Sequence, residues 1–183
     1  LNKINLNTSL TEQFLVSNSE VTNDRQSYIE QIFSINKNEL WIATGAGLRV
    51  FDSMTSKIKD FTNFKPEQQQ LFESDSYGLI QEGRSIIWSL SDDGLIKFDS
   101  LNWTAQLFTF NELGLNGNTI HMIIGYDIRT SSVLLSAAGS LVGFNTDSLK
   151  VSDLHTIKRE GDTLSMWPSS WLRDSKNNFW VSY

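Results

Sequence analysis

The sequence predicts an all-β fold made of repeated four-stranded antiparallel units. A tryptophan-led pattern, "WIATGAGLRVFD", begins at Trp41 and returns as "WSLSDDGLIKFD" at Trp88. It returns again as "LLSAAGSLVGFN" at Leu134 and as "WVSY" at Trp180, with spacings of 47, 46 and 46 residues. Short apolar runs alternate with Gly, Asn, Asp and Ser, and no stretch has a sustained helical period. A four-stranded repeat of about 46 residues is the signature of a β-propeller blade.

Within the first complete unit the pattern predicts four strands separated by polar turns. The predicted strands are residues 28–35, 39–44, 47–52 and 57–62. The intervening segments "NKN", "GAG" and "SMTS" have the residue types of tight turns. Gly47 and Gly94 stand where the chain turns into the third strand of successive units, a place that accommodates a residue without Cβ.

The same period reaches both ends of the chain, because residues 1–8 match residues 48–55 at an offset of 47. We therefore expect a single β-propeller segment over residues 1–183, a partial propeller with three complete and two half blades. The expected half blades are 1–26 and 165–183, and the expected complete blades are 27–74, 75–118 and 119–164. Unpaired strand edges associate, so we expect the half blades to be completed by the remaining blades of a longer propeller or by a second copy of the chain.

Three tryptophans, Trp41, Trp88 and Trp180, hold the same place in successive units. A four-stranded blade cannot bury both of its faces alone, so large side chains must fill the wedge against the neighbouring blade. Identical positions imply an identical structural task, and these residues are predicted to form that packing.

Composition excludes several classes of function. The net charge of −6 is scattered, so no basic patch for nucleic acid is expected. No apolar run approaches the roughly 18 residues of a membrane-spanning helix, so no direct membrane insertion of this segment is expected. The absence of cysteine removes thiolate chemistry and Cys-ligated zinc. No base stands beside a nucleophile in the sequence, and His121 fits a structural histidine, so the segment is predicted to be no enzyme and to need no cofactor or metal.

Ligands of propellers approach one end of the central axis, where the loops into the inner strands and the second-to-third strand turns emerge. Trp167 lies outside the repeat phase, and its ring is a candidate for stacking on a sugar. The acidic stretches 73–78 and 91–94 are interpreted as solvated turns rather than calcium loops. The candidate ligand-binding residues are Tyr28, Arg49, Tyr77, Asp92, Asp93, Lys97 and Trp167.

The stretches "INKNELWIATGAGLRVFD" and "LRDSKNNFWVSY" resemble the two-component-regulator propeller repeat. The resemblance implies the periplasmic sensor region of a hybrid two-component histidine kinase, an inner-membrane protein, responding to carbohydrate breakdown products such as an oligosaccharide. The kinase would lie elsewhere in the parent chain. One unit departs from the pattern, because its tryptophan is replaced by Leu134. The alternative is a non-enzymatic propeller scaffold for protein–protein interaction.

Overall fold

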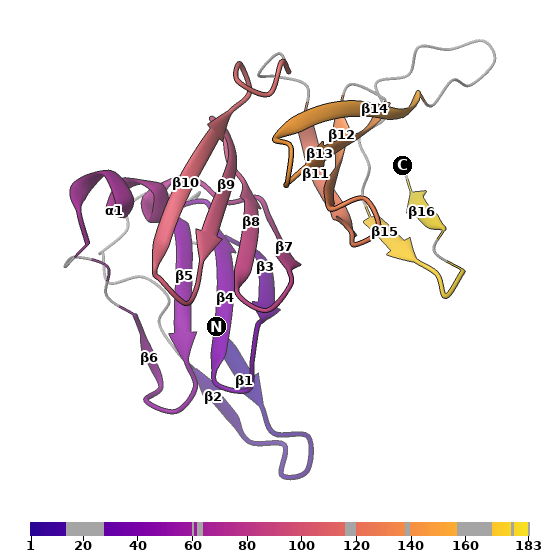
Figure 1. The fold of residues 1–183 in the computed structure, drawn as a ribbon. Coiled ribbons are helices and arrows are strands. Elements are labelled where there is room, and N and C mark those ends of the chain that lie inside the picture. The colour runs from indigo at the N-terminus through magenta and orange to yellow at the C-terminus, as the bar shows by residue number, and fades with distance from the viewer. Residues whose placement is uncertain are drawn as a thin grey trace.

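The computed structural model describes residues 1–13, 28–59, 61, 64–115, 120–137, 140–156, 170–176 and 178–182. In this part of the chain, three four-stranded and two two-stranded antiparallel sheets are present, with one short helix (Figure 1). The prediction of an all-β fold is confirmed.

The strands follow one another in a regular order. The first four-stranded sheet contains β3 (Ile29–Ser34), β4 (Glu39–Thr44), β5 (Gly47–Asp52) and β6 (Lys57–Ile58). The second contains β7 (Gly78–Glu82), β8 (Ile86–Leu90), β9 (Gly94–Asp99) and β10 (Thr104–Thr109). The third contains β11 (Ile120–Asp127), β12 (Ser132–Ala137), β13 (Ser140–Asn145) and β14 (Lys150–Thr156). The two-stranded sheets are β1 (Asn2–Ile4) with β2 (Thr11–Gln13) and β15 (Ser170–Arg173) with β16 (Phe179–Ser182).

Within each four-stranded sheet, neighbouring strands are also neighbours in the sequence. The first strands β3, β7 and β11 lie side by side, so successive sheets stand next to one another with their first strands on one side (Figure 1). The described sheets do not close into a ring, and the number of blades stays a prediction.

The chain departs from the predicted strands after β5. The fourth strand is only Lys57–Ile58, and helix α1 (Pro66–Glu73) follows it. Proline is favoured at the first position of a helix, and glutamine and glutamate are good helix formers. Eight residues give too few turns for a helical period to stand out in the sequence, which is why the pattern missed this element. The helix lies against β5 of the first sheet and β10 of the second, and its Phe72 is buried in the apolar cluster between them.

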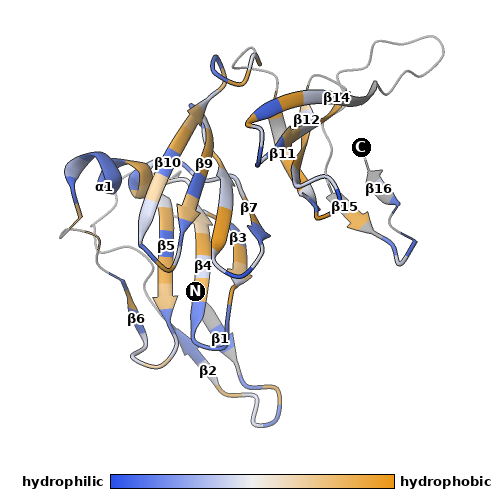
Figure 2. Ribbon diagram, viewed as in Figure 1, coloured by the Kyte–Doolittle hydropathy of each residue, from blue (hydrophilic) through white to orange (hydrophobic). Residues whose placement is uncertain are grey.

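The first wedge, between the β3–β6 and β7–β10 sheets, is filled by Trp41. Its side chain is 0% exposed and meets Phe98 of the second sheet edge-to-face, with ring centroids 6.0 Å apart. Trp103, in the β9–β10 turn, stacks on Trp41 at 5.9 Å, and Lys59 Nζ lies 3.8 Å from the centre of the Trp103 ring. Figure 2 shows apolar residues along β5 and hydrophilic ones along β2 and β6.

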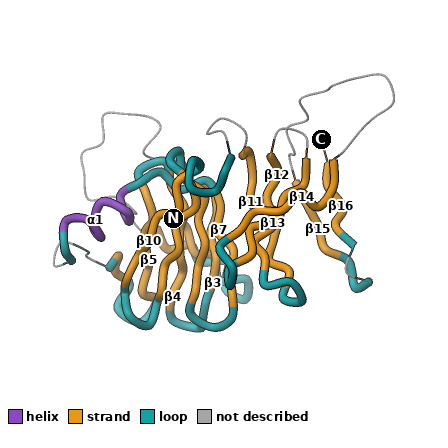
Figure 3. Tube along the Cα trace, turned by 45° about the horizontal axis from the view of Figure 1, so that its top comes forward, coloured by secondary structure: helices purple, strands orange, loops and turns teal. Residues whose placement is uncertain are grey.

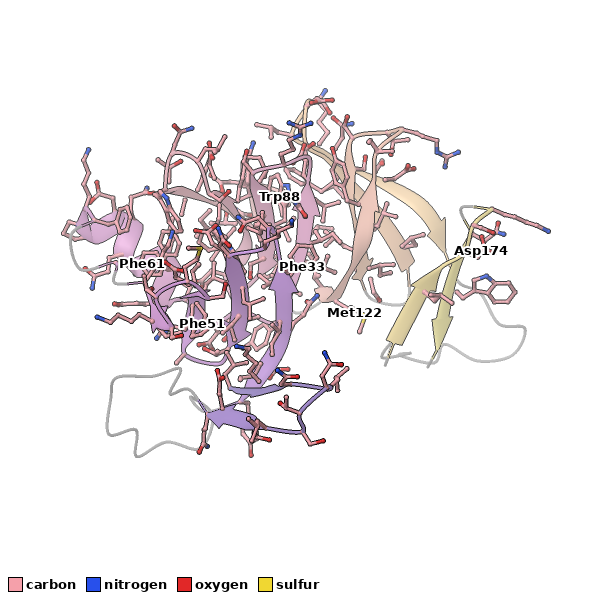
Figure 4. The ribbon with its side chains drawn as sticks, turned by 90° about the horizontal axis from the view of Figure 1, so that it is seen from below. Phe33, Phe51, Phe61, Trp88, Met122 and Asp174 are labelled. Atoms are coloured by element: carbon pink, nitrogen blue, oxygen red, sulfur yellow. The ribbon has the colours of Figure 1, made fainter. Side chains whose placement is uncertain are left out.

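The second wedge, between the β7–β10 and β11–β14 sheets, is filled by Trp88 (Figure 4). Trp88 is also 0% exposed, and it meets Phe144 edge-to-face at 5.4 Å. Its indole N–H donates to Glu82 Oε2 at 2.6 Å. Glu82 Oε1 also accepts from Tyr126 Oη at 3.0 Å and from Thr146 Oγ1 at 2.8 Å, both in the third sheet. One carboxylate therefore joins side chains of two sheets.

The third tryptophan of the series, Trp180, is not buried in this structure, and its role in blade packing stays a prediction. Trp180 is 63% exposed, and the residue paired with it across the strands, Leu172, is 64% exposed. The sheet formed by β15 and β16 has two described strands, and no described sheet covers this face. The indole N–H nevertheless donates to Asp174 Oδ2 at 2.9 Å (Figure 4).

Two glutamine side chains tie neighbouring sheets together through main-chain atoms. Gln31 of β3 donates from Nε2 to the carbonyl of Leu79 at 3.1 Å and accepts from the Leu79 N–H at 2.7 Å. Gln68 of α1 makes the same two-bond contact with the carbonyl and N–H of Ala105 in β10. Each amide satisfies a donor and an acceptor that a strand edge would otherwise leave open.

The turns repeat in detail along the chain. Ser9, Ser56, Trp103 and Leu149 all have positive φ, and they are spaced by 47, 47 and 46 residues. Gly47 and Gly94 also have positive φ, and a Cβ on them would collide with the carbonyl oxygens of Phe72 and Phe108, respectively. These close approaches require glycine at the start of β5 and β9.

The wedge packing predicts unequal losses on truncation. Trp88→Ala should lower the free energy of unfolding by about 3–5 kcal/mol, because it empties a filled interior. Trp180→Ala should cost much less, since its ring is 63% exposed. Urea unfolding of both variants measures the difference, and similar midpoints would contradict the packing described for Trp88.

The two buried indoles also differ in hydrogen bonding. Trp41 Nε1 has no partner among the described residues, whereas Trp88 Nε1 binds Glu82. Trp88→Phe should therefore cost about 1–3 kcal/mol more than Trp41→Phe, because it removes a hydrogen bond to a charged acceptor. Equal unfolding free energies for the two phenylalanine variants would disprove this assignment of the Glu82 bond.

Candidate functional site

The predicted ligand end is formed by the β4–β5 and β8–β9 turns and by the segment that leads into β7. Main-chain hydrogen bonds hold this segment in place. Ser76 N–H donates to the Thr44 carbonyl at 3.1 Å, and Tyr77 N–H donates to the Leu90 carbonyl at 2.9 Å. The segment is thus fixed to the first and second sheets before β7 begins, and Tyr77 is brought beside the turn that carries Asp92.

The phenol of Tyr77 joins two carboxylates at this end. Its Oη donates to Asp92 Oδ1 at 2.8 Å and lies 3.3 Å from Asp75 Oδ2. Burial, followed by the hydrogen bond to Asp92 and the charges of both carboxylates, raises the pKa of Tyr77 far above its ordinary value of 10.0. The hydroxyl therefore stays protonated and keeps donating at neutral pH. The residue is 42% exposed, so aromatic surface and carboxylate oxygens face solvent together.

A pair of buried hydroxyl groups lies beneath this surface. Ser76 Oγ and Ser89 Oγ are 2.6 Å apart, and the two residues are 2% and 0% exposed. The Ser91 hydroxyl, in the next turn, donates to the Gly94 carbonyl at 3.1 Å. Short polar side chains thus satisfy the main chain around the turn, and the position of Asp92 is set by the sheet below it.

Arg49 does not join the Tyr77 group. Its guanidinium turns back to its own hairpin, donating to the Ala46 carbonyl at 2.9 Å and the Leu48 carbonyl at 3.0 Å. Burial lowers the pKa of Arg49, and the charge of Glu73 opposes that shift. The guanidinium N–H groups of Arg49 close the β4–β5 turn.

Lys97 lies inside a wedge rather than at the predicted end. It pairs with Trp88 across β8 and β9, and its Nζ is 5.6 Å from the centre of the Trp88 ring. The sequence placed it at the end because it follows the β8–β9 turn closely. The strand alternation instead directs it to the face that carries Trp88.

The other candidates make no described contact with Tyr77 or lie outside the described residues. Tyr28 precedes β3 and is 60% exposed. Asp93 is exposed, and its carbonyl accepts from the Phe110 N–H at 3.2 Å. Trp167, proposed for sugar stacking, lies outside the described residues, as does the side chain of His121. The structure therefore brings together Tyr77 and Asp92, and adds Asp75.

The sequence analysis missed an acidic residue that precedes two of the tryptophans. Glu82 and Asp174 each stand six positions before the tryptophan whose indole N–H they accept. The corresponding position before Trp41 is Ile35, and there the indole N–H has no described partner. The spacing is visible in the sequence, but it becomes a signal only when the units are aligned on tryptophan.

A pocket lies at the opposite end of the first sheet, between its two hairpin turns. Its volume is about 500 Å³. It is lined by Asn36, Lys37, Asn38, Glu39, Asp52 and Met54. Asn36 and Asp52 use a side-chain oxygen to accept main-chain N–H groups of their own turns. This pocket therefore lies far along the strands from Tyr77, at the end that the sequence analysis did not select.

Among the described residues, no group of three or more acidic, histidine or cysteine side chains is placed to hold a metal ion. A search of the described helices finds none that is long and apolar enough to cross a membrane.

No family model and no curated protein matches the sequence. The fold is similar to that of solved extracellular domains of hybrid two-component systems from B. thetaiotaomicron. The domain of BT4673 has a TM-score of 0.69 at 16% identity, over 93% of this chain and 21% of that one. The domain of BT3049 has a TM-score of 0.66 at 14% identity, over 98% of this chain and 22% of that one.

A structural genomics protein of unknown function from Bacteroides thetaiotaomicron is also similar, with a TM-score of 0.62 at 10% identity. That likeness covers 92% of this chain and 42% of the other. The chain therefore spans about a fifth of the two sensor domains and less than half of this third protein. At these identities the likeness is one of fold.

The raised pKa of Tyr77 predicts a loss of stability at alkaline pH. The folded chain holds the phenolic proton more tightly, so this contribution is complete below 10.0 and is lost as pH rises from there toward the folded pKa. Tyr77→Phe should make the free energy of unfolding fall less steeply above that pH. Tyr28→Phe, at an exposed position before β3, is the matched control, and an equal change in both variants would contradict the role of the Tyr77 group.

Proposed function

We propose that the chain is an extracytoplasmic, ligand-sensing segment of a β-propeller in a hybrid two-component sensor. Its three four-stranded sheets would be the blades 27–74, 75–118 and 119–164, flanked by the half blades 1–26 and 165–183. The segment itself would bind and relay, and the kinase activity would belong to another part of the parent chain. The periplasm is the proposed location.

The observation that carries the proposal is the fold likeness to extracellular domains of two hybrid two-component systems, over 93% and 98% of this chain. In those proteins, too, the matching region is one part of a larger extracellular domain. A sensor segment needs a surface for a signal and a path from that surface into the rest of the fold.

The surface proposed for the ligand is the group formed by Tyr77, Asp92 and Asp75. A carbohydrate presents hydroxyl donors beside apolar C–H faces. Carboxylate oxygens accept hydrogen bonds from hydroxyl groups, and a half-exposed aromatic ring covers an apolar face. Because the Tyr77 hydroxyl already occupies one oxygen of Asp92, the remaining acceptor positions have defined directions. These properties support an oligosaccharide as the ligand.

The proposed path runs along β7. Tyr77 directly precedes this strand, and Glu82 ends it. Glu82 contacts Trp88 in its own sheet and Tyr126 and Thr146 in the next. A ligand that shifts Tyr77 would therefore act on a strand whose far end is bonded to the third sheet. Small shifts of this kind become rearrangements when packed elements have two discrete arrangements.

Oligosaccharide binding should raise the melting temperature of the chain by mass action. At a ligand concentration of about 100 times Kd, the gain is about 2.7 kcal/mol. For a chain of this length that corresponds to a rise of roughly 5–10 °C. Differential scanning fluorimetry with a panel of short neutral and acidic oligosaccharides measures the rise. Asp92→Asn should reduce it, and Asp147→Asn, at the other end of the sheets, should leave it unchanged.

The scaffold alternative makes the opposite prediction for the same experiment. A chain that only holds a protein partner should show no shift with any member of the panel, and Asp92→Asn should then have no consequence for binding. A shift that survives Asp92→Asn unchanged would leave the sensor role in place but move its site away from Tyr77.

A further inference from the structure

The pocket of about 500 Å³ between the β3–β4 and β5–β6 turns has no part in the function proposed above. Figure 3 shows the hairpin turns of the first sheet as loops at one end of its strands. Sites for small molecules have volumes of roughly 300–1,000 Å³, so this pocket has room for such a ligand. Its lining contains an ammonium group, two carboxylates, two amides and one apolar side chain.

Hydrogen bonds between the two turns hold the walls of the pocket. The Ser53 N–H donates to the Asn38 carbonyl at 2.7 Å, and Ser53 Oγ donates to the Lys37 carbonyl at 3.3 Å. Within the first of the turns, Asn36 Oδ1 accepts from the N–H groups of Asn38 and Glu39. The walls are thus bonded together by the chain itself, and a ligand does not have to order them.

Two carboxylates of this pocket stand opposite each other on neighbouring strands. Glu39 of β4 and Asp52 of β5 are directly paired, and both line the pocket. Like charges at directly opposite positions destabilise a sheet. The second sheet avoids this arrangement, because Ile86 stands opposite Asp99. The third sheet has no charged residue at either place. The facing carboxylates therefore distinguish the first sheet from the other two.

A lysine from the fold compensates only one of these two charges directly. Lys59 Nζ lies 2.6 Å from Glu39 Oε1. No described cation lies within ion-pair distance of Asp52, whose Oδ1 accepts from the Met54 N–H at 2.8 Å. That bond above all lowers the pKa of Asp52, so the group is ionised at neutral pH. A carboxylate can accept several hydrogen bonds, and Asp52 therefore offers negative charge to a ligand.

The remaining lining offers the opposite charge and an apolar surface. Lys37 is exposed and forms no ion pair with a described residue. Met54, on the other turn, is 74% exposed, and its flexible thioether side chain adapts to apolar groups of different shape. A ligand in this pocket therefore meets a carboxylate, an ammonium group and an apolar side chain together.

We propose that this pocket binds a small zwitterion, namely an amino acid or a short peptide with a free amino terminus. The ammonium group of the ligand binds at Asp52 and Glu39, its carboxylate binds Lys37, and its apolar side chain lies on Met54. A ligand with one sign of charge would leave a like charge facing it, and a neutral sugar would leave both charges of the pocket without a partner. The site is separate from the Tyr77 group.

Isothermal titration calorimetry of the 183-residue chain with L-leucine and with L-leucyl-glycine tests the proposal. At least one of the two should bind saturably, and its affinity should fall as salt rises. The tighter of the two tells whether the site takes an amino acid or a peptide. N-acetylation of that ligand should weaken binding about tenfold or more, because it removes a hydrogen bond between charged groups. Amidation of its carboxyl group should also weaken binding.

Asp52→Asn removes the charge of the pocket but keeps its turn closed. Asn5 and Asn145 hold the corresponding places in other units, and their side-chain oxygens accept main-chain N–H groups there. Asp52→Asn should therefore fold and weaken binding about tenfold. Lys37→Gln should weaken it as well, by a smaller factor because the residue is exposed. Circular dichroism verifies that both variants fold.

The second sheet supplies matched controls for both variants. Asp99→Asn and Arg84→Gln make similar changes at the corresponding turns, where no second carboxylate faces Asp99. Both should bind as the parent chain does. Absent binding of both ligands at millimolar concentration, equal binding of the N-acetylated ligand, or equal losses in the controls would overturn the proposal. Binding of maltose that Asp52→Asn weakens would overturn it in favour of a sugar pocket. The oligosaccharide site at Tyr77 is tested separately, through Asp92→Asn.

Discussion

The hydrogen bond between Trp88 and Glu82 belongs to a set of bonds that fixes how the second and third sheets pack against each other. Glu82 is partly buried, and its carboxylate accepts three hydrogen bonds, at 2.6, 2.8 and 3.0 Å. Removing a carboxylate from water is costly unless such donors surround it. One donor comes from its own sheet and two come from the next, so the bonds can form together only when the two sheets stand at one angle. Apolar packing of Trp88 against Phe144 fills the wedge, but it does not by itself select that angle.

The preceding wedge uses other means. Trp41 fills it, stacked on Trp103 and edge-to-face with Phe98, but its indole N–H has no partner among the described residues. The hydrogen bonds that join the first and second sheets come instead from Gln31 and Gln68, which bind main-chain groups of the second sheet. The second sheet is thus bonded to its neighbours on both sides, and β7, which Tyr77 precedes, takes part in bonds to both the first and the third sheet.

The repeat made much of this fold readable from the sequence. Strands β3 to β5 fall within one residue of the predicted ranges, because alternating apolar runs and turn residues define them locally. Helix α1 was not predictable in this way, because its eight residues are stabilised by the packing of Phe72 in the apolar cluster and not by a local sequence pattern. Among the candidate residues, Tyr77 and Asp92 meet because the start of β7 pairs with the end of β8. Lys97 and Arg49 do not meet them, because strand alternation and a local turn decide their directions, and neither effect was weighed in the sequence.

The two kinds of inter-sheet bond also constrain how such an array can evolve. Gln31 hydrogen-bonds only main-chain atoms of Leu79 in β7. For this bond, any unit whose first strand takes the place of β7 could follow the first sheet after duplication or recombination. Glu82 accepts hydrogen bonds from the particular side chains of Tyr126 and Thr146, so a unit inserted after the second sheet would leave its partly buried carboxylate without two of its three donors. The junction between the first and second sheets should therefore tolerate exchange of units. The junction between the second and third sheets requires that these two neighbouring units be inherited together.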